Sequence, residues 1–571
     1  MTVTSAATLR GGYWLLAPTD PALVFTPARL SDEHALIGRT AEEFATNEVM
    51  PSLDRLERKD WDLARQLLRK AGQLGLLATD VPEAYGGVAL DKAASVVVAE
   101  GIARSASFGA TMGAQVNLSV MPLVCFGTEA QKRKYLPGLV SGELCGAYCL
   151  SESGSGSDAL GAKARATPQP DGSFVLNGEK MWITNGGFAD VFIVFAKVDG
   201  QHFTAFIVER AFGGVTSGSE EHKMGLHGSS TTPVILQDVR VPAENVLGAV
   251  GKGHKVAFNV LNYGRFKLAA STSGGARVAI AEAVKYAKTR RQFGQPIATF
   301  GAIRHKLAEM AIREYVVESL LYRTAGLIDA FLEGRGSSEG AAVLAALEEF
   351  AVESSIAKVA GSEALNYVLD ENIQIHGGNG FVRDYPAERH YRDSRVNRIF
   401  EGTNEINRIL IPTMLMRRAA KGELSLAAGR LGGAEQPDSP LAGVTHCKTA
   451  VVSLLGIAAM KYGERIADEQ EILTGIADGI IEVYGAESAM LRAMQSGDGL
   501  QMDAAHVAAH DAALRVQASA RQALGALFKG DELKSRVEAS DRQLTPPALD
   551  TIAIRRRIAD AVVEHQRYIF R

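Results

Sequence analysis

The stretch that decides the fold is Ser173-Phe-Val-Leu-Asn-Gly-Glu-Lys-Met-Trp-Ile-Thr184, which is rich in β-branched and aromatic residues. Three further β-rich runs follow it with no long helix between them: Val191–Lys197, Phe203–Glu209 and Val234–Val241. Strands that are joined by short turns, without crossover helices, are typical of antiparallel sheets. We therefore predict an antiparallel β-barrel or sandwich in the middle of the chain.

Helical periodicity flanks this β-rich region on both sides. Trp61–Leu77 carries an apolar stripe at steps of three and four residues, and Asp60 is suited to cap that helix. The predicted fold class is α+β: an N-terminal helical domain, a middle antiparallel β-barrel domain, a C-terminal helical bundle and an extra C-terminal helical domain. After Gly253 we expect helices at Ala276–Thr289, Ile303–Glu333, Ala341–Asp370, Thr403–Met416, Lys448–Gln495 and Ala504–Phe528.

The same pattern sets the expected segment boundaries. Prolines are frequent before residue 30, which predicts an arm, and Gly, Ala, Pro and Ser dominate 422–443, which predicts a linker. The expected segments are an arm (1–30), an all-α domain (31–144), a β-barrel (145–253), a helical bundle (254–420), a linker (421–445) and a helical extension (446–571).

Composition narrows the class of protein. The chain has 571 residues, a length that suggests roughly three to four domains. Its 61 Lys and Arg residues face 65 Asp and Glu residues, a net charge of −4, so no basic excess supports nucleic acid as a partner. Apolar residues make up 46% and charged residues 22%, which argues against global disorder.

Cysteine content and apolar runs bear on the compartment. The four cysteines are too few for a disulfide framework and indicate a reducing compartment, so we expect a cytoplasmic protein. The first 30 residues lack a basic segment followed by a long apolar run, so no signal peptide is expected. The longest apolar stretch, near Ala450–Met460, is short of the ~20 residues that cross a bilayer.

A Gly-rich loop, Ser153-Gly-Ser-Gly-Ser-Asp-Ala159, contains the spacing G-x-G-x-x-A of dinucleotide-binding turns. Such a turn must open a helix, but a β-hairpin of Lys163–Ala166 and Ser173–Leu176 is expected after this one. Two interpretations remain open: a plain tight turn, or a loop whose backbone approaches a flat or anionic ligand.

The most informative stretch is Arg398-Ile-Phe-Glu-Gly-Thr-Asn-Glu-Ile406. Apolar neighbours disfavour the charged form of Glu401, which raises its pKa toward values that suit a general base. Thr403 can cap the next helix. A surface glutamate in a loop is an equally good interpretation of this stretch alone. No metal site is expected, because His506 and His510 lack the glutamate of H-E-x-x-H.

Five stretches together resemble the acyl-CoA dehydrogenases in order and spacing, over about Ser31 to Met416. The resemblance implies an FAD enzyme that oxidises a fatty acyl-CoA to the trans-2-enoyl-CoA in fatty acid β-oxidation and passes electrons to an electron-transferring flavoprotein. The five stretches are Tyr148-Cys-Leu-Ser-Glu-Ser-Gly-Ser-Gly-Ser-Asp158, Lys180-Met-Trp-Ile-Thr-Asn-Gly186, Arg290-Arg-Gln-Phe-Gly294, Gln374-Ile-His-Gly-Gly-Asn-Gly380 and Ile399-Phe-Glu-Gly-Thr-Asn404.

The resemblance also implies roles for single residues. Glu401 would remove the α-proton, and its backbone N–H would help to polarise the thioester carbonyl. Some relatives carry the base one residue before Arg265, where this chain has Gly264, so Glu401 is the one well-placed base. The residues implied to bind substrate are Ser157, for the CoA part, and Asn262, Arg265 and Gly402. The residues implied to bind FAD are Tyr148, Leu150, Ser151, Trp182, Ile183, Thr184, Thr403 and Glu405, with Arg290, Gln292, Phe293, Gln374, Gly377 and Gly378 reaching the FAD of a neighbouring subunit.

The tail after Met416 is similar to the C-terminal extension of the very-long-chain members, through Asp468–Tyr484. That likeness implies a long-chain substrate and a homodimer. Membrane association is disfavoured, because the region with Pro437 and Pro440 has few Lys or Arg residues. Two alternatives stay open: an acyl-CoA oxidase that reduces O₂, and a scaffold or assembly protein of low activity on the same fold.

Overall fold

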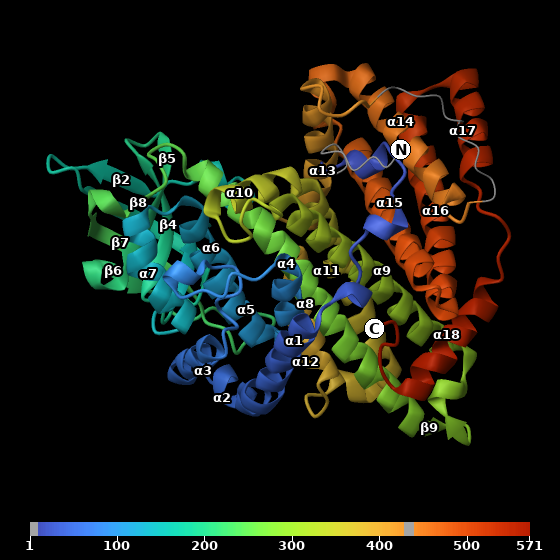
Figure 1. Cartoon of the computed structure of the whole chain (residues 1–571), viewed down its shortest axis with the longest axis horizontal. Helices are drawn as coiled ribbons and strands as arrows, with labels where there is room; N and C mark the ends of the chain where they lie inside the picture. Colours follow the sequence, from blue (N-terminus) through green and yellow to red (C-terminus); the bar gives the residue numbers. More distant parts are fainter. Residues whose placement is uncertain (1–9, 427–438) are drawn as a thin grey trace.

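The computed structural model describes residues 10–426 and 439–571. A helical region, a sheet, a helical bundle and a further set of helices follow one another, which confirms the predicted order (Figure 1). The sheet lies at one end of the molecule and the last helices at the other, with α8 (Gly253–Thr289), α9 (Gly301–Leu332) and α11 (Ala351–His376) between them. The predicted arm (1–30) and linker (421–445) fall partly outside the described residues.

Most of the N-terminal helices begin where a side chain accepts from a free N–H group of the first turn. Oδ1 of Asp60 accepts from the N–H of Leu63 at 3.1 Å, so the predicted cap of α3 is confirmed. That helix ends earlier than predicted, because the chain turns at Gly75, whose φ is 73°. The helices of this region are α1 (Asp32–Phe44), α2 (Leu53–Glu57), α3 (Trp61–Gln73), α4 (Lys92–Ile102), α5 (Ala106–Gln115), α6 (Met121–Phe126) and α7 (Glu129–Ser141).

The middle region is an open eight-stranded sheet, so the prediction of an antiparallel β-barrel was wrong. Its order is β6-β7-β3-β2-β4-β5-β8, with β1 paired to β4. The edge strands β6 and β8 have three and two residues, too short to pair and close the sheet. Strand β4 runs parallel to both β1 and β2, which the short-turn argument did not anticipate. The strands are β1 (Gly146–Cys149), β2 (Arg165–Pro168), β3 (Phe174–Thr184), β4 (Val191–Val198), β5 (His202–Glu209), β6 (Val215–Ser217), β7 (Thr231–Val241) and β8 (Val246–Leu247).

Strand β4 is buried on both faces. Val191, Ile193 and Phe195 pack in a cluster that includes side chains of α7 and α8, whereas Phe192 and Val194 pack among residues of the sheet itself. A strand covered on both faces reads as a continuous apolar run. The predicted hairpin is confirmed by the antiparallel register of β2 and β3, with Ala166 opposite Leu176.

Two of the long predicted helices are broken. Phe350 leaves helical geometry, with ψ at 27°, and separates α10 from α11 within the predicted Ala341–Asp370 helix. A 3₁₀ segment, Gly463–Asp468, separates α14 from α15 within the predicted Lys448–Gln495 helix. The remaining helices are α10 (Gly340–Glu349), α12 (Ala387–Ser394), α13 (Asn404–Ala420), α14 (Ala442–Tyr462), α15 (Gln470–Ser496), α16 (Gly499–Leu527), α17 (Gly530–Leu544) and α18 (Thr551–His565), and a hairpin of β9 (Arg291–Gln292) and β10 (Gln295–Pro296) follows α8.

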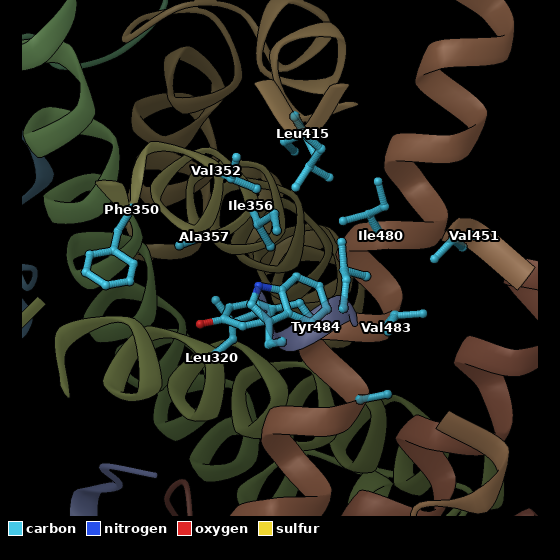
Figure 2. Close-up of a cluster of buried hydrophobic side chains, with 14 of the residues drawn as sticks. Leu320, Phe350, Val352, Ile356, Ala357, Leu415, Val451, Ile480, Val483 and Tyr484 are labelled. Atoms are coloured by element: carbon cyan, nitrogen blue, oxygen red, sulfur yellow. The ribbon is translucent and has the colours of Figure 1, made fainter. Parts of the chain in front are cut away.

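The helical bundle and the C-terminal extension share one hydrophobic core. Figure 2 shows Ile356 of α11 and Leu415 of α13 facing Ile480 and Tyr484 of α15. The N-terminal segment joins the same core, because the Trp14 ring lies 4.5 Å from that of Tyr484, between centroids. The extension is therefore packed onto the bundle by continuous apolar contact.

Two helical stretches are long and apolar enough to cross a membrane by length and composition alone, Ala106–Phe126 and Ala442–Asp468. Their most apolar windows are 67% and 56% buried inside the protein. Core helices of a folded domain show the same property, so this observation is weak evidence for a membrane span.

Candidate active site

Glu401 lies in a tight left-handed turn between the bundle helices. Its φ is 58° and that of Gly402 is 78°, a region that residues with side chains rarely adopt. The turn ends at Thr403, whose Oγ1 accepts from the N–H of Ile406 at 3.2 Å and caps α13 as predicted. Glu405 follows, exposed on the first turn of that helix.

The carboxylate of Glu401 packs against Gly264 of α8. A Cβ built on Gly264 would lie 2.6 Å from Oε2 of Glu401 and 2.7 Å from its Cδ. No larger residue fits at position 264 while the carboxylate keeps this position. The glycine therefore makes room for the base, and the residue at 264 and the residue at 401 constrain each other.

Arg265 and Asn262, both buried on α8, hold the turn from one side. Nε of Arg265 donates to the carbonyl oxygen of Glu401 at 3.0 Å, and Nη1 donates to Oδ1 of Asn262 at 2.9 Å. Asn407 holds the other side, since its Nδ2 donates to the carbonyl oxygen of Gly402 at 2.9 Å. Of the residues implied to bind substrate, Asn262, Arg265 and Gly402 thus lie together at the Glu401 turn.

Burial raises the pKa of Glu401 to about 7, and the positive charges of Arg265 and Lys358 oppose that rise. Oε2 of Glu401 is buried and has no hydrogen-bond partner among the residues that the structure describes. A desolvated carboxylate with a pKa near 7 and an oxygen that is free to accept suits the removal of a proton from carbon. The phenol of Tyr148 lies near enough for the Glu401 charge to add to the rise in its own pKa, which burial dominates.

Lys358 is a residue that the sequence reasoning missed. Its Nζ donates to the carbonyl oxygen of Gly402 at 2.9 Å and to Oδ1 of Asn404 at 2.6 Å. Its side chain is fully buried on α11. The signal was present as a lysine inside an apolar helical run, between Ala357 and Val359, where a charge needs a specific partner.

The segments implied to border the flavin lie along β1 and β3. Leu150 and Ser151 are held to β3 by Nζ of Lys180, which donates to the Leu150 carbonyl at 3.2 Å, and by the N–H of Met181, which donates to the Ser151 carbonyl at 2.9 Å. The pairing of β3 with β7 shifts register between Lys180 and Ile183. This bulge gives Trp182 a φ of 57° and leaves it 56% exposed, while Ile183 stays buried and Thr184 returns to the ladder.

These surfaces are open enough for a flat cofactor. A Cβ on Gly154 or Gly156, in the loop that carries the exposed Ser157, would meet no atom within 4 Å, and the same holds for Gly377 and Gly378. Backbone without side chains and an exposed indole permit close approach of an aromatic ring system. The residues present therefore fit FAD.

The second group of predicted FAD residues lies far from Glu401 within one chain. Phe293 is 92% exposed at the tip of the β9–β10 hairpin, beside the exposed Arg290 and Gln292. The turn at Gln374, Gly377 and Gly378 is its neighbour, because the rings of Tyr286 and His376 stack at 4.1 Å. Sixteen residues of α11 separate Gln374 from Lys358, about 24 Å at ~1.5 Å per residue. Figure 1 shows β9 far from the sheet.

A basic recess of about 550 Å³, also missed from the sequence, opens on the sheet next to the Gly-rich loop. Lys163, Arg165 and Lys197 line it, together with Asp199. Arg165 and Lys197 are register partners on β2 and β4, and Lys163 lies two residues before Arg165, so the three side chains share one face. None of the three forms an ion pair with a described residue. Like charges placed opposite each other are destabilising without an anion between them.

Four family models match this chain. The acyl-CoA dehydrogenase N-terminal, middle and C-terminal domains match residues 31–143, 147–239 and 251–416, and a further acyl-CoA dehydrogenase C-terminal domain matches 446–542. The chain therefore belongs to the acyl-CoA dehydrogenase family, whose members are FAD-dependent oxidoreductases.

The similarity to particular relatives extends over most of the chain. A probable acyl-CoA dehydrogenase of Bacillus subtilis (strain 168) is 43% identical, over 98% of each chain. The mitochondrial very long-chain specific acyl-CoA dehydrogenase of Homo sapiens is 38% identical, over 81% of this chain and 73% of its own. The crystal structure of an acyl-CoA dehydrogenase complexed with FAD from Bacillus anthracis is 45% identical, with a TM-score of 0.96 over 98% of this chain and 100% of its own.

Proposed function

We propose that this acyl-CoA dehydrogenase oxidises long-chain fatty acyl-CoA to trans-2-enoyl-CoA in fatty acid β-oxidation and passes the electrons to an electron-transferring flavoprotein. The observation that carries the proposal is the desolvated Glu401 carboxylate on Gly264, beside open surfaces that fit FAD. The C-terminal extension supports a long-chain substrate, because the human very long-chain specific relative aligns with 81% of this chain.

The side chains of this site divide the work of the reaction. Glu401 takes the α-proton, and the electron pair of that C–H bond forms the double bond as the β-hydrogen leaves as hydride. The chemistry that FAD supplies when bound is acceptance of that hydride. Arg265 and Asn407 hold the carbonyls of residues 401 and 402, so the carboxylate and the Glu401 N–H keep a fixed geometry.

The basic recess offers a physical reason why the substrate would be a CoA ester. CoA carries several phosphate charges, and Lys163, Arg165 and Lys197 offer three cations on one face that form no ion pair within the described part of the chain. The loop with Ser157 lies shortly before β2 in the chain. We infer that the nucleotide end of CoA lies over this recess while its thioester reaches Glu401.

We also propose a homodimer. Arg290, Gln292, Phe293, Gln374, Gly377 and Gly378 lie together on one surface, remote from their own Glu401. A second copy of the chain would bring this surface to the FAD of the first. The exposure of Phe293, and of Phe381 at 85%, gives such an interface apolar contacts. We further propose a cytoplasmic location, supported by the low cysteine content.

One experiment separates this function from its alternatives. The purified yellow protein is mixed anaerobically with acyl-CoAs from short to very long chains, and flavin absorbance is followed. Bleaching that is fastest with long chains supports the proposal, whereas no bleaching with any chain supports a scaffold of low activity. Reoxidation by an electron-transferring flavoprotein without H₂O₂ release distinguishes the dehydrogenase from an oxidase.

A further inference from the structure

Lys358 is a buried cation without a counter-ion of its own. It lies on α11, its side chain is fully buried, and it forms no ion pair with any residue that the structure describes. Its two hydrogen-bond acceptors, the Gly402 carbonyl and the Asn404 amide, are neutral. A charge in such a place is costly unless another charge compensates it.

The charged groups around Lys358 identify that compensating charge. Glu363, one turn along α11, is engaged by Arg408 of α13 at 2.7 Å. Glu405 is exposed at the start of α13, where the helix N-terminus stabilises its carboxylate. Arg265 of α8 is also positive and lowers the pKa of Lys358 further.

Glu401 is the negative charge that remains. Burial lowers the pKa of Lys358 to about 7, and Glu401 is the strongest influence opposing that fall. On its own side Glu401 faces two cations, Arg265 and Lys358, and the neutral phenol of Tyr148 from β1. Arg265 is tied to the Glu401 carbonyl and Asn262. Lys358 is tied to the residues on the far side of the turn, so the two cations hold the turn from different directions.

We propose that Lys358 is a positioning residue for the reaction: its ammonium group anchors Gly402 and Asn404 so that the Glu401 carboxylate stays on Gly264, and its charge keeps that carboxylate ionised. The inference rests on the proposed function, because it assigns Lys358 a role through the base. A neutral residue at 358 removes the charge nearest the base on that side. The ionised form of Glu401 then loses stability, and proton abstraction needs a higher pH.

The test is the pH dependence of flavin reduction in single turnover, for wild type, Lys358→Met and Lys358→Arg. We expect the midpoint of Lys358→Met to move to higher pH by on the order of one unit or more, the effect of removing an adjacent opposite charge. Lys358→Arg keeps the charge and should keep the wild-type midpoint. FAD content and thermal midpoint are measured on each variant, since a purely structural lysine would change these and leave the pH midpoint alone.

Lys267→Met is the matched control. Lys267 is also buried, its pKa is lowered to about 8, and the charges that affect it are Asp80, Lys92 and Glu100, with no contribution from Glu401. Its replacement should lower the thermal midpoint without moving the pH midpoint. If Lys358→Met does not fold, Lys358→Gln removes the charge and keeps an N–H donor on a side chain that is one bond shorter.

The outcomes distinguish this inference from the proposed function. An unchanged pH midpoint in a folded, FAD-loaded Lys358→Met or Lys358→Gln overturns the role of Lys358 alone. Loss of FAD in both neutral variants, with a normal Lys358→Arg, assigns the lysine to folding and overturns it too. If no acyl-CoA bleaches the wild type, the proposed function fails first and the role of Lys358 fails with it.

Discussion

The carboxylate of Glu401 rests on the bare Cα of Gly264, so closely that a Cβ at position 264 would lie 2.6 Å from Oε2. The contact joins α8 to the left-handed turn before α13. It gives a steric reason for the glycine at position 264. The two positions cannot both hold side chains in this geometry.

Gly264→Ala should therefore displace the base without emptying the cofactor site. A shift of about 1 Å in a reacting group costs on the order of a hundredfold in rate, so we expect flavin reduction by acyl-CoA to slow by about that factor. FAD content should stay normal. Gly275→Ala on the same helix is the control, because its Cβ would make only ordinary contact, 3.5 Å from Leu365. Wild-type rates in Gly264→Ala would contradict the packing of Glu401.

The rate of flavin reduction should depend on the ionisation of Glu401. Only the deprotonated carboxylate accepts the α-proton, and burial raises the pKa of Glu401 to about 7. The single-turnover rate should therefore rise with pH through a midpoint near 7 and level off above it. A midpoint near the ordinary glutamate value would show that Glu401 is solvated in the working enzyme.

Charge reversal in the basic recess should weaken binding of CoA esters. Lys197→Glu places a carboxylate opposite Arg165, so the recess loses its attraction for phosphate. We expect KM for acyl-CoA to rise several-fold, more at low salt, with kcat little changed. The matched substrate is the same acyl group on pantetheine, which lacks the nucleotide and should show no change. An equal loss with both substrates would place the nucleotide of CoA elsewhere.

The extension and the bundle should unfold together. Glu487 of α15 pairs with Arg323 of α9 at 2.9 Å and with Lys448 of α14, all of them buried. Glu487→Ala leaves two buried cations, which costs about 3–5 kcal/mol. Thermal unfolding followed by helical CD and by flavin fluorescence should show one transition, shifted down in both signals. Glu482→Ala, at a more exposed pair with Arg515, should change stability by less than about 1 kcal/mol. A separate transition for the extension would contradict the shared core.

The order of helices and strands could be predicted from the sequence, because periodicity reports which residues face a core. The caps at Asp60 and Thr403 were also predictable, because Asp and Thr directly before a helix accept from its free N–H groups. Sheet closure was not, since it depends on which strands become partners. The parallel pairing of β4 with β1 and β2 joins strands that are not consecutive in the chain, and the sequence pattern does not show which of them become neighbours.

The site was predictable where a stretch of sequence carries its own chemistry. Glu401, between apolar residues and a glycine, suggested a base, and its raised pKa agrees with that reading. Lys358 lies 43 residues before it and contacts the next residue, Gly402, only through the packing of α11 against the turn. The basic recess likewise depends on the register of β2 with β4. The sequence shows a lysine inside an apolar helical run, but it does not show which distant segment that lysine contacts.

The central claim is that Glu401 removes the α-proton, and Glu401→Gln tests it most directly. The amide keeps the size of the side chain and the contact with Gly264, so FAD content and thermal midpoint should match wild type. Anaerobic mixing with a long-chain acyl-CoA should then leave the flavin oxidised, while the wild type bleaches. Flavin reduction at an ordinary rate in the FAD-loaded Glu401→Gln variant would contradict the account.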